Sequence, residues 1–275
     1  MCKLFFSYRH KNPKKLLRKF LKHGNAEHSK YGYGLSWKTD SAWGTHKCNC
    51  FHMTDPDSKK IIKDIDSTII ASHIRNIYHE NMTPQQICDE IAVENTHPFT
   101  YKDATFMHHG DLFLDFAGDS NSFQLHHNAR EWKLAMAKTM KYMSPELKSK
   151  IKGKTDSEIL FYLLLSIQQQ LECSEQDGMD AVVQSFYILT RILDEADISN
   201  SSNILFSKGD YIAVAKIYKK NSSHELKNPA FYLDIDEQGG MLFSNVKLTN
   251  HGEDVEKNTL YVINSKTNEL RIYRL

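Results

Sequence analysis

The sequence lacks long apolar segments and any strong excess of one charge. No stretch of its 275 residues is both long and apolar enough to span a bilayer. The opening apolar segment, residues 3–6, is too short for the core of a signal peptide. The formal net charge is only +1, which gives no support to a nucleic acid or a membrane as partner. These absences predict a cytoplasmic protein that binds neither.

Cysteine is also scarce, and its positions form no framework. The chain has five cysteines, Cys2, Cys48, Cys50, Cys88 and Cys173. An odd and scattered set is typical of reduced thiols inside a cell rather than of a disulfide scaffold. Its position makes Cys2 the cysteine with the strongest claim to a function.

Basic residues concentrate at the beginning of the chain. Residues 1–26 contain eight Lys or Arg and no acid. Asn12 can cap a helix here, and Pro13 suits its first position. A basic amphipathic helix can lie on a membrane. Because the apolar stripe is short, we favour a surface helix packed on its own core. The stripe consists of Leu16, Leu17, Phe20 and Leu21.

Strand patterns come first along the chain, helical patterns follow, and strand patterns return. We expect strands at 33–38, 67–75, 104–108, 203–206, 211–218, 231–235, 240–244, 259–264 and 269–273, and helices at 130–143, 156–167 and 181–193. The apolar run 159–167 should be buried on all sides, and 197–203 should form a polar loop. This order predicts an α+β layered domain, and no repeat or low-complexity linker divides it.

Cys2 is a candidate nucleophile because removal of Met1 would place its thiol and a free α-amino group on one residue. An α-amine has a pKa of roughly 7.7 to 8.0 and a thiol roughly 8.5, so the amine can accept the thiol proton near neutral pH. Position alone does not distinguish this role from that of an ordinary thiol.

Six segments together resemble one family. They are Met1–Phe5, Lys30–Trp37, Ser72–Arg75, Glu94–Phe99, Phe106–Gly110 and Thr155–Glu158. All occur in the order of class II glutamine amidotransferase domains, and the resemblance spans nearly the whole chain. It is closest to the stand-alone branch with the bacterial YafJ-like proteins and the glutathione-degrading amidotransferase subunit of yeast. It implies one domain, residues 2–275, with the four-layer α/β/β/α sandwich of N-terminal-nucleophile hydrolases.

The resemblance also assigns roles to individual residues. Cys2 would be the nucleophile that attacks a γ-amide of glutamine. Arg75 would bind the substrate's α-carboxylate and Asp156 its α-ammonium group, although from the residues alone Arg75 could be a structural ion-pair partner and Asp156 a helix N-terminal charge. His73, Asn95 and His97 also match the family, where we expect them to fix strands and loops through hydrogen bonds.

Two positions depart from the family's pattern. The family's oxyanion hole combines an Asn side chain with the backbone N–H of the next Gly. Gly110 is present here, but His109 stands in the Asn position, and an imidazole can donate one hydrogen bond. Tyr31 replaces the family's usual Asp before Gly32. The predicted function is therefore a glutamine or γ-glutamyl amidohydrolase, with a weakened or inactive binding protein as the alternative.

Partners and cofactors are expected to be few. The final strands complete the predicted sheets and leave no acceptor domain in this chain. The protein would hydrolyse glutamine or a γ-glutamyl compound such as a glutathione-like peptide, or pass ammonia to a separate subunit. A separate peptidase subunit is a further expectation. No cofactor is expected.

A zinc hydrolase is the third class of function that the sequence raises. His46, Cys48, Cys50 and His52 alternate, but the ends of such an extended strand lie about 20 Å apart at about 3.3 Å per residue. Zinc ligands must lie within about 2.3 Å of one point. The adjacent pairs 108–109 and 126–127 would point apart if extended. We expect no metal site.

Overall fold

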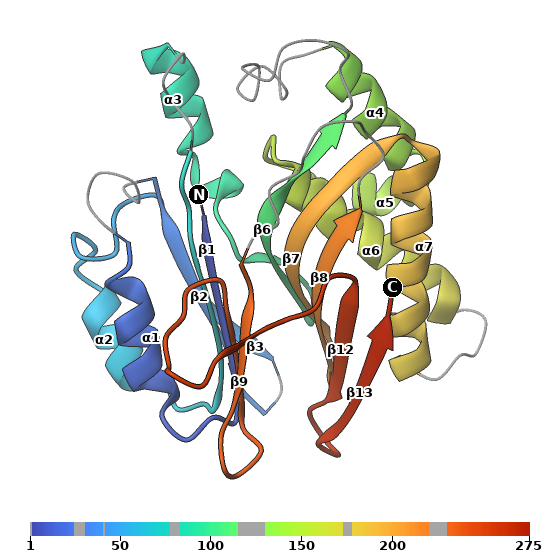
Figure 1. The fold of residues 1–275 in the computed structure, drawn as a ribbon. Helices are drawn as coiled ribbons and strands as arrows, with labels where there is room; N and C mark the ends of the chain where they lie inside the picture. Colours follow the sequence, from blue (N-terminus) through green and yellow to red (C-terminus); the bar gives the residue numbers. More distant parts are fainter. Residues whose placement is uncertain are drawn as a thin grey trace. The chain divides into compact units, whose positions relative to one another are not determined.

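The computed structural model describes residues 2–24, 31–40, 42–77, 83–114, 130–172, 178–219 and 230–275. These residues form two antiparallel sheets with helices (Figure 1), which confirms the predicted α+β class. The chain divides into two compact units. Unit 1 comprises Met1–His109 and Pro229–Val255, and unit 2 comprises Gly110–Asn228 and Glu256–Leu275.

Unit 1 is built on a seven-stranded sheet in the order β11-β9-β10-β1-β4-β2-β3. The strands are β1 (Lys3–Tyr8), β2 (Tyr33–Lys38), β3 (Trp43–Cys48), β4 (Ile69–Ile74), β9 (Tyr232–Ile235), β10 (Met241–Ser244) and β11 (Glu253–Asp254). The first strand of the chain, β1, is central, because it pairs antiparallel with both β4 and β10. Its N-terminal end therefore lies between the ends of two other strands.

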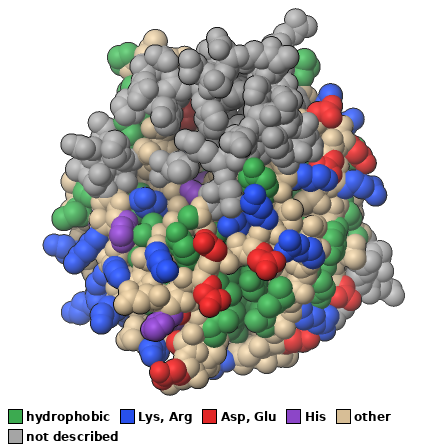
Figure 2. All heavy atoms as spheres, in the orientation of Figure 1, with side chains coloured by type: hydrophobic (Ala, Val, Ile, Leu, Met, Phe, Trp, Pro, Cys, Tyr) green, Lys and Arg blue, Asp and Glu red, His purple; other side chains and the backbone are tan. Residues whose placement is uncertain are grey.

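The helices of unit 1 are α1 (Pro13–Leu21), α2 (Ser58–Asp64) and α3 (Pro84–Glu90), with a short 3-10 turn at Val93–Asn95. The four residues of the predicted stripe of α1 are buried and pack on sheet residues such as Phe5 and Ile70. Lys and Arg side chains gather over α1 and α2 (Figure 2). The interpretation of α1 as a surface helix on its own core is confirmed, although Asn12 makes no side-chain cap.

The second sheet has the order β13-β12-β8-β7-β6-β5. Its strands are β5 (Phe99–Tyr101), β6 (Ala104–Leu114), β7 (Ile198–Lys208), β8 (Tyr211–Lys219), β12 (Thr259–Asn264) and β13 (Glu269–Arg274). The chain passes from unit 1 into unit 2 within β6, between His109 and Gly110.

Among the described residues of unit 2 the helices are α4 (Arg130–Met140), α5 (Pro145–Lys148), α6 (Asp156–Glu172) and α7 (Gly178–Glu195). Helix α6 packs against α7, and α7 packs against β7, β8 and β12. The apolar run 159–167 is buried throughout, as predicted. At the start of α6, Glu158 N donates to Thr155 Oγ1 at 3.2 Å, which is one half of a capping box. The Glu158 carboxylate instead accepts from the backbone of Lys152 and Gly153.

The expected polar loop at 197–203 is wrong. Residues from Ile198 onward belong to β7, and every residue of that strand except its last is buried. Its register with β8 pairs Asn200 with Lys219 and Asn203 with Lys216. Strand pairing therefore satisfies the backbone hydrogen bonds of β7, although many of its buried side chains are small and polar.

Within the described ranges, no helix combines the length and apolarity needed to cross a bilayer.

Candidate functional site

The position of Cys2 follows from the pairing of β1. Lys3 lies opposite Ile74 of β4, so Cys2, the residue before it, lies beside the segment that follows β4. Phe5 lies opposite Ser244 of β10, and Asn245 N donates to Leu4 O at 3.2 Å just beyond that pair. Strand pairing thus brings Cys2 together with residues more than 70 and more than 240 positions away in sequence.

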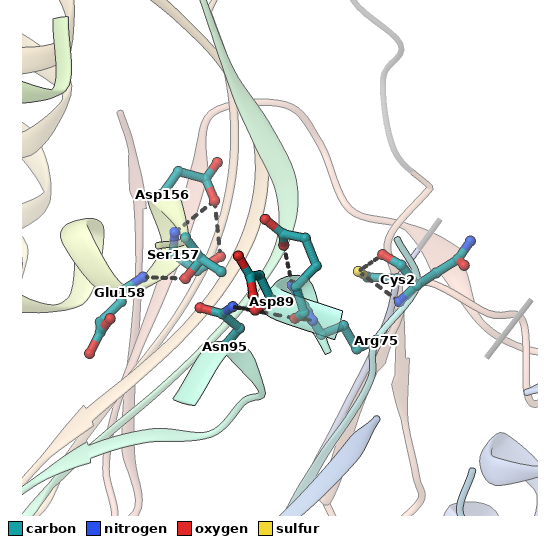
Figure 3. A network of polar contacts seen from close by, with 10 residues as sticks. Cys2, Arg75, Asp89, Asn95, Asp156, Ser157 and Glu158 are labelled. Carbon is teal, nitrogen blue, oxygen red and sulfur yellow. Dashed lines mark hydrogen bonds and ion pairs between the residues drawn. The ribbon is translucent and has the colours of Figure 1, made fainter. Parts of the chain in front are cut away.

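The thiol of Cys2 is held by the backbone of Asn76, the residue after Arg75. Cys2 Sγ donates to Asn76 O at 3.3 Å, and Asn76 N donates to Cys2 Sγ at 3.3 Å. Figure 3 shows these two bonds at the sulfur. Because Asn76 supplies both bonds from its main chain, the sulfur position depends on the course of the backbone after β4.

The side chain of Arg75 is buried and faces the C-terminal end of α3 (Figure 3). Its Nη2 lies 2.9 Å from Glu90 Oε2, and its Nη1 donates to the main-chain O of Glu90. Asn95 Nδ2 donates to Asp89 O at 3.0 Å and to Glu90 O at 3.3 Å, which holds the same helix end. Arg75 N also donates to Gly32 O at 2.8 Å, which joins the residue just before β2 to the end of β4.

His109 lies in β6 and is connected to Cys2 through Asn245. Asn245 Nδ2 lies 3.1 Å from His109 Nε2 and donates to Cys2 O at 3.2 Å. Burial, together with the nearby His108 ring, lowers the pKa of His109 to about 3. The imidazole is therefore neutral near pH 7 and carries its proton on only one ring nitrogen.

Gly110 begins unit 2 in a conformation that favours glycine. Its φ is +149°, and a Cβ at this position would lie 2.1 Å from the main-chain O of Ser201 in β7. Both the dihedral angle and the close approach of two strands exclude a side chain here.

Asp156 lies at the first position of α6, in unit 2. Its Oδ2 accepts from Leu112 N at 3.2 Å, and its Oδ1 accepts from Ser157 N at 2.7 Å. Figure 3 shows Asp156 with Ser157 beside it. The carboxylate is buried and oriented by backbone donors from two elements, β6 and its own helix.

The three residues expected to have structural roles divide into two kinds. Asn95 fixes the end of α3, as predicted. The rings of His73 and His97 instead pack on each other, with centroids 4.0 Å apart, and their nitrogens find no hydrogen-bond partner among the described residues. Burial holds the pKa of both well below the usual range, so both rings are neutral.

The alternating His and Cys set is not one extended strand. Strand β3 ends at Cys48, and Cys48 forms a disulfide with Cys50, which corrects the expectation of reduced thiols throughout. The chain turns between them, and their Cα atoms lie only 5.2 Å apart. His46 Nε2 lies 2.6 Å from Asp55 Oδ2.

Residues 126 and 127, as well as Cys173, lie outside the described residues. In the part of the chain that the structure describes, no three His, Cys, Asp or Glu residues could hold a metal ion.

Sequence reasoning missed three members of this site, namely Asn76, Glu90 and Asn245. Asn76 and Asn245 lie in irregular segments just after β4 and β10, where Asn is common and therefore carries no distinctive signal. Glu90 ends a helix whose start was detectable, because Thr83 and Gln86 form a capping box around Pro84. Predicting α3 from the sequence would still not have shown that Glu90 lies beside Arg75, because that contact depends on how α3 packs in the folded protein.

Comparison with known proteins identifies the fold. No family model matches the chain, and no curated protein matches its sequence. A glutamine aminotransferase class-II domain protein from Silicibacter pomeroyi is similar in structure, with a TM-score of 0.58, 16% identity, and coverage of 100% of this chain and 99% of that one. Glutamine phosphoribosylpyrophosphate amidotransferase from B. subtilis gives a TM-score of 0.62 at 12% identity and covers 99% of this chain.

An allosteric regulatory enzyme of purine biosynthesis gives a TM-score of 0.63, also at 12% identity and with 99% of this chain covered. The chain spans about half of each of these last two proteins, 49% in both cases. The predicted arrangement of two antiparallel sheets with helices is therefore the fold shared with class II amidotransferase domains.

Proposed function

We propose that the chain is an amidohydrolase that cleaves glutamine or a γ-glutamyl amide, with Cys2 as nucleophile after removal of Met1. The observation that carries this proposal is the position of Cys2 within unit 1. Its sulfur is bonded to the residue after Arg75, and its carbonyl is bonded to the Asn245 amide that also contacts His109. These contacts connect Cys2 with His109 through Asn245, and with the end of β4 that carries Arg75, and they support the proposal.

The reaction balances with one protein nucleophile and one water. The Cys2 thiolate attacks the γ-carbonyl carbon, a C–S bond forms, and the C–N bond breaks. The released amine or ammonia takes the proton that the thiol lost, which the α-amino group of Cys2 would carry. Water then attacks the thioester carbonyl, the C–S bond breaks, a proton from the water returns to the sulfur, and glutamate leaves.

The remaining residues would recognise charge on the substrate. Arg75 would bind the α-carboxylate, and Asp156 the α-ammonium group. Gly110 N–H and His109 would stabilise the oxyanion of the tetrahedral intermediate. Residues 2–275 would act as one domain of the stand-alone, YafJ-like branch, in the cytoplasm. The ammonia or amine would be released into solution, or ammonia would be passed to a separate subunit.

The experiment is a comparison of wild type with Cys2→Ala on glutamine and on γ-glutamyl peptides, with released glutamate as the readout. The proposal expects glutamate from the wild type and none from the variant. Equal release from both would contradict it, and binding of glutamine without release would favour the alternative of a binding protein on the same fold.

A further inference from the structure

The side-chain amide of Asn245 bonds to three groups at once, all in unit 1. Its Oδ1 accepts from Leu4 N at 2.8 Å, while its Nδ2 lies 3.2 Å from Cys2 O and 3.1 Å from His109 Nε2. The backbone of Asn245 is itself anchored, because its N–H donates to Leu4 O at 3.2 Å. The amide therefore extends from a position fixed by the pairing of β10 with β1.

The chemistry of its partners fixes which way this amide faces. A main-chain N–H can only donate and a main-chain carbonyl can only accept, so Oδ1 must face Leu4 and Nδ2 must face Cys2. Nδ2 carries two hydrogens, and among the described residues it contacts two acceptors, Cys2 O and His109 Nε2. Both hydrogens of the amide are then used.

The orientation of Asn245 decides the tautomer of His109. Since Nε2 accepts a hydrogen bond, it cannot carry a proton, and a neutral imidazole must then carry its proton on Nδ1. The ring is buried, with 2% of its residue surface exposed, which favours the neutral form. The donor of this ring is therefore Nδ1–H.

Resting on the proposed amide hydrolysis, we propose that Asn245 is a positioning residue, which holds the Cys2 carbonyl and fixes His109 as the Nδ1–H tautomer that donates to the oxyanion. Substitution of the family's Asn by His at position 109 replaces an amide, which can rotate to present N–H, with a ring that needs a specified tautomer. Asn245 supplies that specification. It touches neither the reacting atoms nor the substrate in this account.

Asn245→Asp tests the assignment. The carboxylate keeps the acceptor for Leu4 N, but its second oxygen has no proton to offer, so it favours a proton on His109 Nε2. Nitrogen-15 NMR of the protein labelled in its histidines reports the protonation of each ring nitrogen, and His109→Asn identifies the His109 signals by their loss. We expect an unprotonated Nε2 in the wild type and a protonated Nε2 in Asn245→Asp.

A matched control is Asn264→Asp, at the last residue of β12, just before the turn to β13. Asn264 Oδ1 accepts from the backbone N of Lys266 and Thr267, at 3.0 and 3.2 Å, and Asp preserves these acceptors. This variant should leave the His109 signals unchanged. If Asn245→Asp does not fold, the wild-type spectrum still decides, because a protonated Nε2 there overturns the proposal.

Kinetics separate positioning from a general structural role. Asn245→Asp should lower kcat about 100-fold, the typical loss of one oxyanion donor, with KM changed by less than about 3-fold. In a His109→Asn background the same substitution should cost less than about 10-fold, because an amide at 109 has no tautomer to set. Equal losses in both backgrounds would overturn the proposal.

A wild type with the expected tautomer but no amidase activity would overturn the proposed function and, with it, the effect of Asn245 on catalysis. The assignment of the His109 tautomer would stand.

Discussion

The guanidinium of Arg75 is bonded through both terminal nitrogens to Glu90, with Nη2 2.9 Å from Glu90 Oε2 and Nη1 on the main-chain O of the same residue. The residue predicted to bind a substrate carboxylate thus already has a protein carboxylate beside it. A guanidinium has five N–H donors, so donors remain for a second anion. The ion-pair interpretation of Arg75 is therefore compatible with its predicted role in substrate binding.

Glu90→Gln should therefore strengthen substrate binding. Loss of the Glu90 charge leaves Arg75 less neutralised, so KM for glutamine should fall several-fold with little change in kcat, while the free energy of unfolding falls by about 1 kcal/mol. Steady-state kinetics and urea denaturation measure the two effects. Glu94→Gln, an exposed acid nearby in sequence, is the control and should change neither. A higher KM in Glu90→Gln would mean that Glu90 positions Arg75 instead.

Gly110→Ala should be severely destabilising. The new Cβ would meet the backbone of β7, with Ser201 O at 2.1 Å, and a side chain also disfavours the positive φ. We expect a loss of roughly 3 kcal/mol or more in the free energy of unfolding. Gly239→Ala is the matched control, since its φ is +78° but no atom lies within 4 Å of the added Cβ. Its cost should be about 1 kcal/mol, that of the dihedral angle alone. Equal costs would show that the contact with β7 is unimportant.

The free energy of unfolding should decrease as the pH is lowered from about 6.5 toward 3, because of His109. Its pKa is about 3 in the folded protein, lowered first by burial, against about 6.5 when unfolded. Between these values the unfolded state binds the extra proton, so the free energy of unfolding decreases as pH falls, by up to about 1.4 kcal/mol per pH unit for this group. Above pH 6.5 the group contributes no pH dependence. His109→Asn should reduce the slope measured by urea denaturation between pH 6 and 4, and an unchanged slope would contradict the assignment.

Asp156→Asn should weaken recognition of the substrate ammonium. KM for glutamine should rise about 10-fold or more, whereas an analogue without the α-amino group should be cleaved as by the wild type. Stability should also fall by about 1 to 3 kcal/mol, because the amide NH2 would face one of two backbone donors, Leu112 N or Ser157 N. The control is Asp180→Asn, in the first turn of α7, which removes a helix-terminal charge together with its exposed ion pair to Arg271 and should cost below about 1 kcal/mol. A rise in KM of the same size for the analogue would assign Asp156 a purely structural role.

Sequence periodicity predicted the helices and strands in which the buried side chains are apolar. Helix α6 was predictable because its run 159–167 is apolar on all sides, and β12 with β13 because a turn separates two β-rich segments. The beginning of β7 was not, since its Ser and Asn residues are typical of loops yet are buried by pairing with β8. Polarity alone cannot distinguish a loop from a buried polar strand.

Residues of the candidate site could be predicted only where they lie in a recognisable local motif. Cys2, Arg75 and Asp156 lie in recognisable segments. Asn245 is separated from His109 by 136 positions, and their side chains come into contact only in the folded structure. The extended geometry assumed for residues 46–52 also failed, because the chain turns after Cys48. Contacts formed by the ends of strands depend on register, which the sequence of any one strand does not contain.

The most direct measurement is covalent labelling with a diazo-ketone analogue of glutamine, followed by intact and peptide mass spectrometry. The account predicts a mature chain without Met1 that carries one adduct on Cys2, with glutamine slowing the labelling and Cys2→Ala abolishing it. Cys88, an exposed thiol, is the internal control and should remain unmodified at the same dose. A chain that retains Met1 and takes up no adduct, or an adduct that persists in Cys2→Ala, would contradict the account.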